Sequence, residues 1–232
     1  HGVMVLFDSN TGYLKCVLHD EGHLTNVRTA IAGAICAKYI APIQIKGIGI
    51  VGTGIQAKMQ LKYLKLVTNC REVFVLGRTT EKISKYINDM NLLGFNVEKV
   101  SNSSELCEKS NLIVTTTNAN ESLIYRNDIQ KGTHITAIGS DTPEKRELDP
   151  EILNIADAVV VDSISQCLER GETKKALDKN LIKEKNLIEI GEIIDTNKKI
   201  RRNNEEITVA DLTGVAVQDI MITNAVYEQL IK

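Results

Sequence analysis

Short apolar runs alternate with amphipathic stretches along most of the chain after Lys46. The apolar runs predict strands at Gly47–Val51, Glu72–Leu76, Asn96–Val100, Asn111–Thr116, Thr133–Ile138, Ala158–Val161 and Ile207–Val209. The stretches between them predict helices at Ala57–Val67, Thr80–Leu93 and Ser103–Cys107, around Pro150–Ile155, and from about Val215. Strands that are apolar on both faces and alternate with helices indicate an α/β fold. We expect a doubly wound, mostly parallel sheet with helices on both sides.

The N-terminal stretch has a different pattern. Two short apolar runs, Val3–Phe7 and Leu14–Leu18, flank the turn-rich residues 8–12 and predict a β-hairpin. An Ala-rich segment follows, which we expect to be a helix that is capped by Thr25, continues to Tyr39 and is ended by Pro42. The hairpin and helix therefore precede the alternating part of the chain.

A glycine-rich turn follows the first strand of the alternating set and opens its helix. Its sequence is Gly52-Thr53-Gly54-Ile55-Gln56-Ala57, which has the form G-x-G-x-x-A. Gly52 permits a tight turn, Gly54 lets the backbone approach a pyrophosphate, and Ala57 allows close packing of helix on strand. The amides and dipole of the helix N-terminus favour phosphate. In this strand–turn–helix context the motif predicts a Rossmann-like dinucleotide site, and a purely structural glycine turn is the alternative.

The end of the second strand bears on the choice of cofactor. An acidic residue there would accept hydrogen bonds from the ribose hydroxyls of NAD. This sequence has Gly77 instead, followed by Arg78 and Thr79, which are suited to a 2′-phosphate. NADP(H) is therefore favoured over NAD(H), which stays open, because Arg78 could instead stack on the adenine or point to water.

Composition excludes several other classes of protein. The chain has 43% hydrophobic and 25% charged residues and a net charge of −2, which is typical of a globular protein and argues against nucleic-acid or membrane partners. The basic residues between Lys198 and Arg202 are followed by two glutamates and predict a solvated loop. The five cysteines are widely spaced and form no C-x-x-C pair, so we expect a cytoplasmic protein. His19 and His23 lack a third ligand, and no metal site is predicted.

Four ordered blocks of sequence resemble the ornithine cyclodeaminase/mu-crystallin family. They are residues 24–30 (LTNVRTA), the turn at 52–57, residues 139–148 (GSDTPEKREL) and residues 211–216 (DLTGVA). The resemblance implies a dinucleotide-binding domain, here residues 28–232, and a second domain for dimerisation and substrate binding, of which residues 1–27 would be a remnant. The chain would thus correspond to a fragment that lacks most of the N-terminal domain.

The resemblance also implies roles for individual residues. Arg28 would bind the substrate carboxylate, for which a guanidinium fork is suited, although an arginine near a helix start also pairs with acids. Asp141 would be the catalytic aspartate that takes a proton from the substrate ammonium or from water, although Gly139–Pro143 is also good turn sequence. Further residues would contact the cofactor: Thr117, Ile135, Ala137, Ile138, Lys145 and Leu212. Leu212 departs from a serine that many relatives carry.

The implied function is hydride transfer at the α-carbon of an amino or imino acid by an NAD(P)-dependent enzyme. Absence of an acid at Gly77 slightly favours a ketimine or imino-acid reductase, or an alanine-type dehydrogenase. One alternative is an ornithine cyclodeaminase, which makes proline and ammonia with recycled NAD. Another is a non-catalytic NADPH-binding protein of the crystallin type. The full-length protein is expected to be a homodimer, with a small amino- or imino-acid substrate as its other partner.

Overall fold

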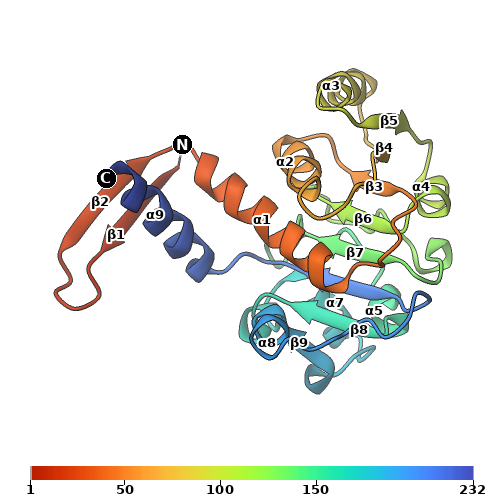
Figure 1. The fold of residues 1–232 in the computed structure, drawn as a ribbon. Coiled ribbons are helices and arrows are strands. Elements are labelled where there is room, and N and C mark those ends of the chain that lie inside the picture. The colour runs from red at the N-terminus through yellow and green to blue at the C-terminus, as the bar shows by residue number, and fades with distance from the viewer. Residues whose placement is uncertain (1, 232) are drawn as a thin grey trace.

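A parallel sheet of eight strands forms the centre of the protein (Figure 1). The structure is a computed structural model and describes residues 2–231. The strand order is β5-β4-β3-β6-β7-β10-β8-β9, and every neighbouring pair is parallel. The strands are β3 (Ile48–Val51), β4 (Glu72–Leu76), β5 (Asn96–Lys99), β6 (Leu112–Thr115), β7 (His134–Ala137), β8 (Ala158–Val161), β9 (Leu187–Glu189) and β10 (Thr208–Asp211). The predicted fold class is confirmed.

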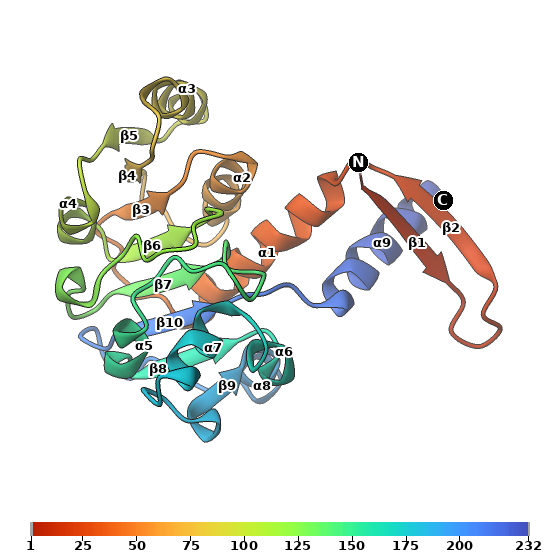
Figure 2. The ribbon, with the colours of Figure 1, turned by 180° about the vertical axis from the view of Figure 1, so that it is seen from behind.

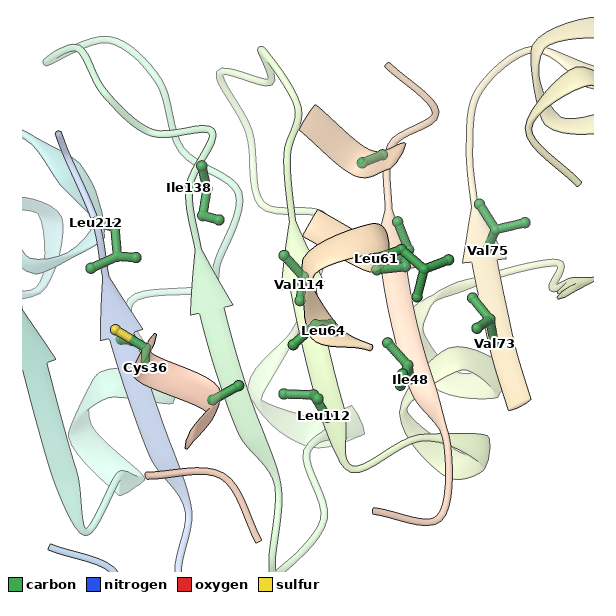
Figure 3. Packing of buried hydrophobic residues seen from close by; sticks show 14 of the residues in the cluster. Cys36, Ile48, Leu61, Leu64, Val73, Val75, Leu112, Val114, Ile138 and Leu212 are labelled. Carbon is green, nitrogen blue, oxygen red and sulfur yellow. The ribbon is translucent and has the colours of Figure 1, made fainter. Parts of the chain in front are cut away.

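Helices cover both faces of this sheet because its central strands are buried on both sides. On one face lie α1 (His23–Ile40), α2 (Ile55–Leu64), α3 (Thr80–Asn91) and α8 (Ile190–Thr196). On the other lie α4 (Ser103–Lys109), α5 (Glu151–Ile155), α6 (Ile164–Cys167) and α7 (Gly171–Asp178). Alternate residues of β6 serve the two cores: Leu112 and Val114 face the first, and Ile113 the second. Figure 3 shows Leu61 and Leu64 of α2 packed over the first face.

A smaller unit projects from the sheet domain (Figures 1 and 2). It consists of an antiparallel hairpin, β1 (Val3–Phe7) and β2 (Leu14–His19), and the C-terminal helix α9 (Ala216–Leu230). Helix α9 packs on β1 and on α1, which runs between this unit and the sheet. The expected domain boundary after residue 27 therefore falls inside α1, and α9, assigned by sequence to the dinucleotide-binding part, lies on the hairpin. How the functional domains divide stays a prediction.

Several local predictions were wrong. Gly22, not Thr25, is the N-cap of α1, and the Asp20 carboxylate accepts a hydrogen bond from the Leu24 amide at 2.6 Å. Ser103, which the sequence suggests as the cap of its helix, is the first residue of α4, and Asn102 is the N-cap. Arg201 is buried rather than solvated: its guanidinium donates to the carbonyls of Ile40, Thr133 and Glu206 and to the Thr208 hydroxyl. The sequence pattern also gave no prediction for α6, α7, α8 or β9.

None of the helices within residues 2–231 has the length and apolar character that crossing a membrane requires.

Candidate active site

The glycine turn lies at the carboxyl end of β3, where the strand order of the sheet reverses. Gly52 has φ +112°, and a Cβ atom there would lie 2.7 Å from the Thr116 hydroxyl. At Gly54 a Cβ would enter open space, which is the space that a pyrophosphate needs beside the backbone. Helix α2 starts at Ile55 without a side-chain cap, so its first amides have no side-chain partner there. Thr53 and Gln56 complete the turn, and this geometry fits a dinucleotide phosphate.

The neighbouring strand end carries the residues that bear on cofactor choice. A Cβ at Gly77 would lie 2.9 Å from both Ile83 Cγ1 and Thr53 Cγ2, so an acidic side chain would not fit without a shift. Arg78 is exposed, and within residues 2–231 no hydrogen bond or ion pair engages its guanidinium. Thr79 is the N-cap of α3, and its side chain makes no capping bond. Both side chains are therefore free to meet a ligand at this edge.

A cavity of about 220 Å³ lies beside the turn and brings together residues that are far apart in sequence. Five of them were predicted as site residues: Arg28, Gln56, Ile138, Asp141 and Leu212. The remaining lining residues come from α1, from the segment after β10 and from α9: Thr25, Asn26, Thr29, Ala32, Thr213, Gly214 and Gln218. The cavity therefore lies between the carboxyl edge of the sheet and the two helices that lead to the hairpin.

Arg28 is held on one side by the first turn of α9. Its Nε donates to the Asp219 carboxylate at 2.9 Å, and its Nη1 to Gln218 Oε1 at 3.2 Å. Gly214, with φ +80°, lies against the guanidinium, and a Cβ at this position would be 2.9 Å from Nη1. No hydrogen bond within residues 2–231 engages Nη2. The guanidinium thus keeps donors for a carboxylate in the cavity.

Asp141 follows β7 and its side chain is half exposed. Its carboxylate forms an ion pair with Lys145 Nζ at 2.6 Å. Lys145, which was predicted to contact the cofactor, does not line the cavity and contacts Asp141 instead. The pair places an ammonium donor beside the candidate proton-transfer group.

The other predicted cofactor residues lie around the same edge, but not all face the cavity. The side chains of Ile135 and Ala137 are buried in the core on the α4–α7 side of the sheet, and that of Ile138 turns to the opposite face. Only Ile138 of these three lines the cavity. Thr117 does not line it, and its amide donates to Glu147 Oε1 at 2.5 Å.

Three buried carboxylates behind this edge were missed from the sequence. They belong to Glu147, Glu172 and Asp211, each at most 1% exposed. Burial raises the pKa of Glu147, raises that of Glu172 well above its ordinary value, and raises that of Asp211 to about 6. Glu147 and Asp211 lie within blocks that carry the family resemblance, and an acid at the end of an apolar strand such as β10 is a signal that could have found Asp211.

The same residues do not indicate a metal centre. Within the described part of the chain, no group of three or more His, Cys, Asp or Glu side chains is arranged to hold a metal ion.

The chain is similar to known proteins both in sequence and in fold. The sequence profile of the ornithine cyclodeaminase/mu-crystallin family matches residues 1–232. An alanine dehydrogenase of Archaeoglobus fulgidus is 35% identical over 97% of this chain and 69% of its own length. The structure of an archaeal alanine dehydrogenase dimer with bound NAD superposes with a TM-score of 0.92 at 34% identity, covering 98% of this chain and 70% of that one. That of Thermococcus litoralis Δ1-pyrroline-2-carboxylate reductase with NADH and L-proline gives 0.90 at 30% identity, covering 98% and 71%.

Proposed function

Because the chain belongs to the ornithine cyclodeaminase/mu-crystallin family, we propose that it is a reductase or dehydrogenase that uses NADP(H) to interconvert an amino acid and its imino acid. In coarser terms it is an NAD(P)-dependent enzyme that transfers hydride at the α-carbon of an amino or imino acid. The main support for a reaction on an amino or imino acid is the cavity beside the glycine turn, which both Arg28 and Asp141 line.

Each residue of the cavity has a task that its chemistry supports. Arg28 binds the substrate carboxylate through the donors of Nη1 and Nη2, and this fixes the α-carbon over the edge of the sheet. The turn Gly52–Gln56 holds the pyrophosphate, and the cofactor, when bound, accepts or supplies the hydride. Ile138 and Leu212 exclude water from that part of the cavity.

Asp141 is the group that handles the proton. Its carboxylate accepts a proton from the substrate ammonium before hydride leaves the α-carbon, and in reduction the resulting carboxylic acid returns that proton to the amine nitrogen after hydride has been added. Lys145, which does not line the cavity, donates to the Asp141 carboxylate at 2.6 Å and so holds it in place.

The preference for NADP(H) rests on the second strand end. Gly77 stands where NAD enzymes carry the ribose-binding acid, and such an acid would fit here only if the side chains of Ile83 and Thr53 shifted. Arg78, Thr79 and the N-terminus of α3 together supply donors for a 2′-phosphate. Related structures contain NAD or NADH, so the preference is a property proposed for this chain alone. The probes for substrate are Δ1-pyrroline-2-carboxylate and pyruvate with ammonia, since similar proteins carry the corresponding names.

Calorimetric titration with NADPH and NADH tests the proposal. We expect the wild-type protein to bind NADPH about 10- to 100-fold more tightly, because charge-assisted hydrogen bonds to a phosphate contribute about 1.5–3 kcal/mol. Arg78→Ala should abolish the difference. Lys179→Ala, which removes an exposed charge elsewhere, should preserve it. Preference for NADH, or a mutant indistinguishable from wild type, would refute the phosphate site and favour ornithine cyclisation. NADPH binding without turnover of any probe would favour a non-catalytic binding protein.

Two further properties belong to the proposal. A homodimer formed through the hairpin would cover the outward side chains of β1, since Val3, Val5 and Phe7 are each about half exposed. An alanine dehydrogenase of similar structure is described as a dimer. A cytoplasmic location is consistent with the five cysteines, all of which are free thiols.

A further inference from the structure

The Glu147 carboxylate joins the carboxyl ends of two neighbouring strands. Its Oε1 accepts a hydrogen bond from the Thr117 amide at 2.5 Å, just after β6. Its Oε2 accepts from the Gly139 amide at 2.8 Å, just after β7, and from the Thr115 hydroxyl at 2.7 Å. The side chain is fully buried. One carboxylate therefore sets the spacing between the two segments that leave these strands.

The Glu147 carboxylate is packed closely against the backbone of Gly139 and Thr117. A Cβ at Gly139 would lie 2.1 Å from the Thr117 carbonyl oxygen and 2.6 Å from Glu147 Cδ, so only glycine fits between them. The cavity residue Ile138 directly precedes Gly139, and Asp141 follows it after Ser140. A change in the position of the Gly139 amide would therefore move the backbone that carries both of them.

The joined strand ends lie under one half of the dinucleotide. The pyrophosphate lies at the turn after β3, and the adenosine ribose lies at the end of β4. In the sheet, β6 and β7 are on the other side of β3 from β4. The nicotinamide half must therefore extend over the ends of β6 and β7, where Thr117 and Gly139 are held.

Two further buried carboxylates hold the backbone around Glu147 and the start of α7. The Glu172 carboxylate, at the start of α7, accepts from the amides of Glu147 at 2.6 Å and Leu148 at 3.2 Å. The Asp211 carboxylate accepts from the Thr173 amide at 2.7 Å. Within residues 2–231 no lysine or arginine forms an ion pair with any of the three acids. Burying carboxylates without a cation is costly, and such an arrangement is found at functional sites more often than in a plain core.

We infer that Glu147 is a positioning residue for hydride transfer, which fixes the ends of β6 and β7 against the nicotinamide half of the cofactor. The inference rests on the proposed dinucleotide site but not on the identity of the substrate. Glu147 touches neither substrate nor cofactor: it acts through the backbone of Thr117 and Gly139, and through Gly139 on Ile138 and Asp141.

Glu147→Gln tests this role with little change of shape. A glutamine offers one acceptor oxygen, and its NH₂ group would face the amide of Thr117 or Gly139, so one strand end must move. Each protein should be titrated with two ligands. One is the cofactor that the wild-type protein prefers, and the other is the fragment of that cofactor that lacks nicotinamide, which is ADP-ribose for NAD(H) and 2′-phospho-ADP-ribose for NADP(H). We expect the mutant to bind the whole cofactor about tenfold more weakly, and the fragment within about twofold of wild type. The amide of Gly139 should also exchange its hydrogen faster, even without ligand.

Two further variants keep the test decisive. Thr115→Val removes one hydrogen-bond donor to the carboxylate without changing the shape of the side chain, and it can replace Glu147→Gln if that variant does not fold. It should weaken binding of the whole cofactor less than Glu147→Gln does, and should leave binding of the fragment unchanged. Ser110→Ala removes a buried hydroxyl at the C-terminus of α4, near the amino end of β6 and so at the opposite end of this strand from Glu147, and should affect neither ligand.

Equal weakening of cofactor and fragment, or no weakening at all, would overturn the positioning role. Wild-type protein that binds neither ligand would overturn the dinucleotide site and this inference together. A selective loss in a protein that reduces no imino acid would support the positioning role while refuting the proposed reaction.

Discussion

One buried histidine should lower the stability of this fold on mild acidification, relative to a variant in which that position does not titrate. His134 lies in β7 at the centre of the sheet, with Nδ1 2.9 Å from the Thr208 hydroxyl and Nε2 3.0 Å from the Thr136 hydroxyl. Thr208 donates its own proton to the Ile40 carbonyl, so Nδ1 must be the protonated nitrogen and the ring is neutral. Burial, and to a lesser extent the charge of Arg201, lower the pKa of His134 from 6.5 to about 3.

The size of the effect follows from this shift. The unfolded chain takes up a proton on His134 as the pH falls below 6.5, and the folded protein does not do so until about pH 3. The contribution of neutral His134 to the stability of the folded protein is therefore fully present above pH 6.5, and it is lost as the pH falls from 6.5 toward 3. At 1.36 kcal/mol per pKa unit, the loss between pH 7 and pH 5 is about 2 kcal/mol. Asp211, with its pKa raised to about 6, and Glu147 and Glu172, whose pKa values are also raised by burial, oppose this loss because the folded protein binds a proton on each of them before the unfolded chain does.

A comparison with His134→Gln isolates the histidine from Asp211. The glutamine amide can bond to both threonine hydroxyls but does not titrate. Urea unfolding followed by circular dichroism, at pH 7 and pH 5, should show wild type losing about 2 kcal/mol relative to the variant. A difference between the two proteins that stays constant within about 0.5 kcal/mol would refute a neutral, buried His134.

Two further predictions concern the cavity and the hairpin. Arg28→Lys should raise the KM for Δ1-pyrroline-2-carboxylate or pyruvate about tenfold, because an ammonium lacks the fork that holds a carboxylate. The cofactor Kd should not change, and an equal rise in that Kd would contradict a carboxylate site at Arg28. Val5→Lys, on the outward face of β1, should shift the protein toward monomer in sedimentation equilibrium with little change in Tm. A wild-type protein that is already a stable monomer would contradict the dimer interface.

The parts of the structure that sequence predicted are those whose signal is local. Strands such as β6 and β8 are apolar except for Thr115 at the end of β6, and they are buried on both faces, as in a parallel sheet covered by helices. The glycine turn needed only its flanking strand and helix to be recognised. The placing of Arg28 and Asp141 in one cavity followed from the family resemblance rather than from any local pattern.

The parts that sequence missed depend on tertiary contacts. Arg201 lies in a run of basic residues that looks solvated, and only the approach of the α1 C-terminus and β10 surrounds it with carbonyls. The pattern of α9 shows an apolar face but cannot say whether the sheet or the hairpin covers it. Glu147 looks like any surface glutamate in a polar loop, and its role arises because two strand ends converge on it.

In the proposed site, cofactor recognition and substrate recognition would be separated. The glycine turn, Arg78 and Glu147 all belong to the sheet domain. The far wall of the cavity comes from α1 and α9, the two helices that connect the sheet to the hairpin. Arg28 on α1 is bonded to Gln218 and Asp219 on α9, so the carboxylate fork is fixed where these helices meet.

This division has a consequence for specificity. In the proposed site, substitutions at Thr25 or Thr29 would alter the wall that faces the substrate side chain. Asn26 differs from them, because its Oδ1 accepts a hydrogen bond from Gln56 of the glycine turn at 2.9 Å. The same sheet can therefore serve different amino and imino acids, which accords with the different substrates named for proteins of similar sequence and fold. Substrate choice in this protein is then to be sought in the surface of α1 and in what the hairpin unit brings against it, and cofactor choice at the ends of β3 and β4.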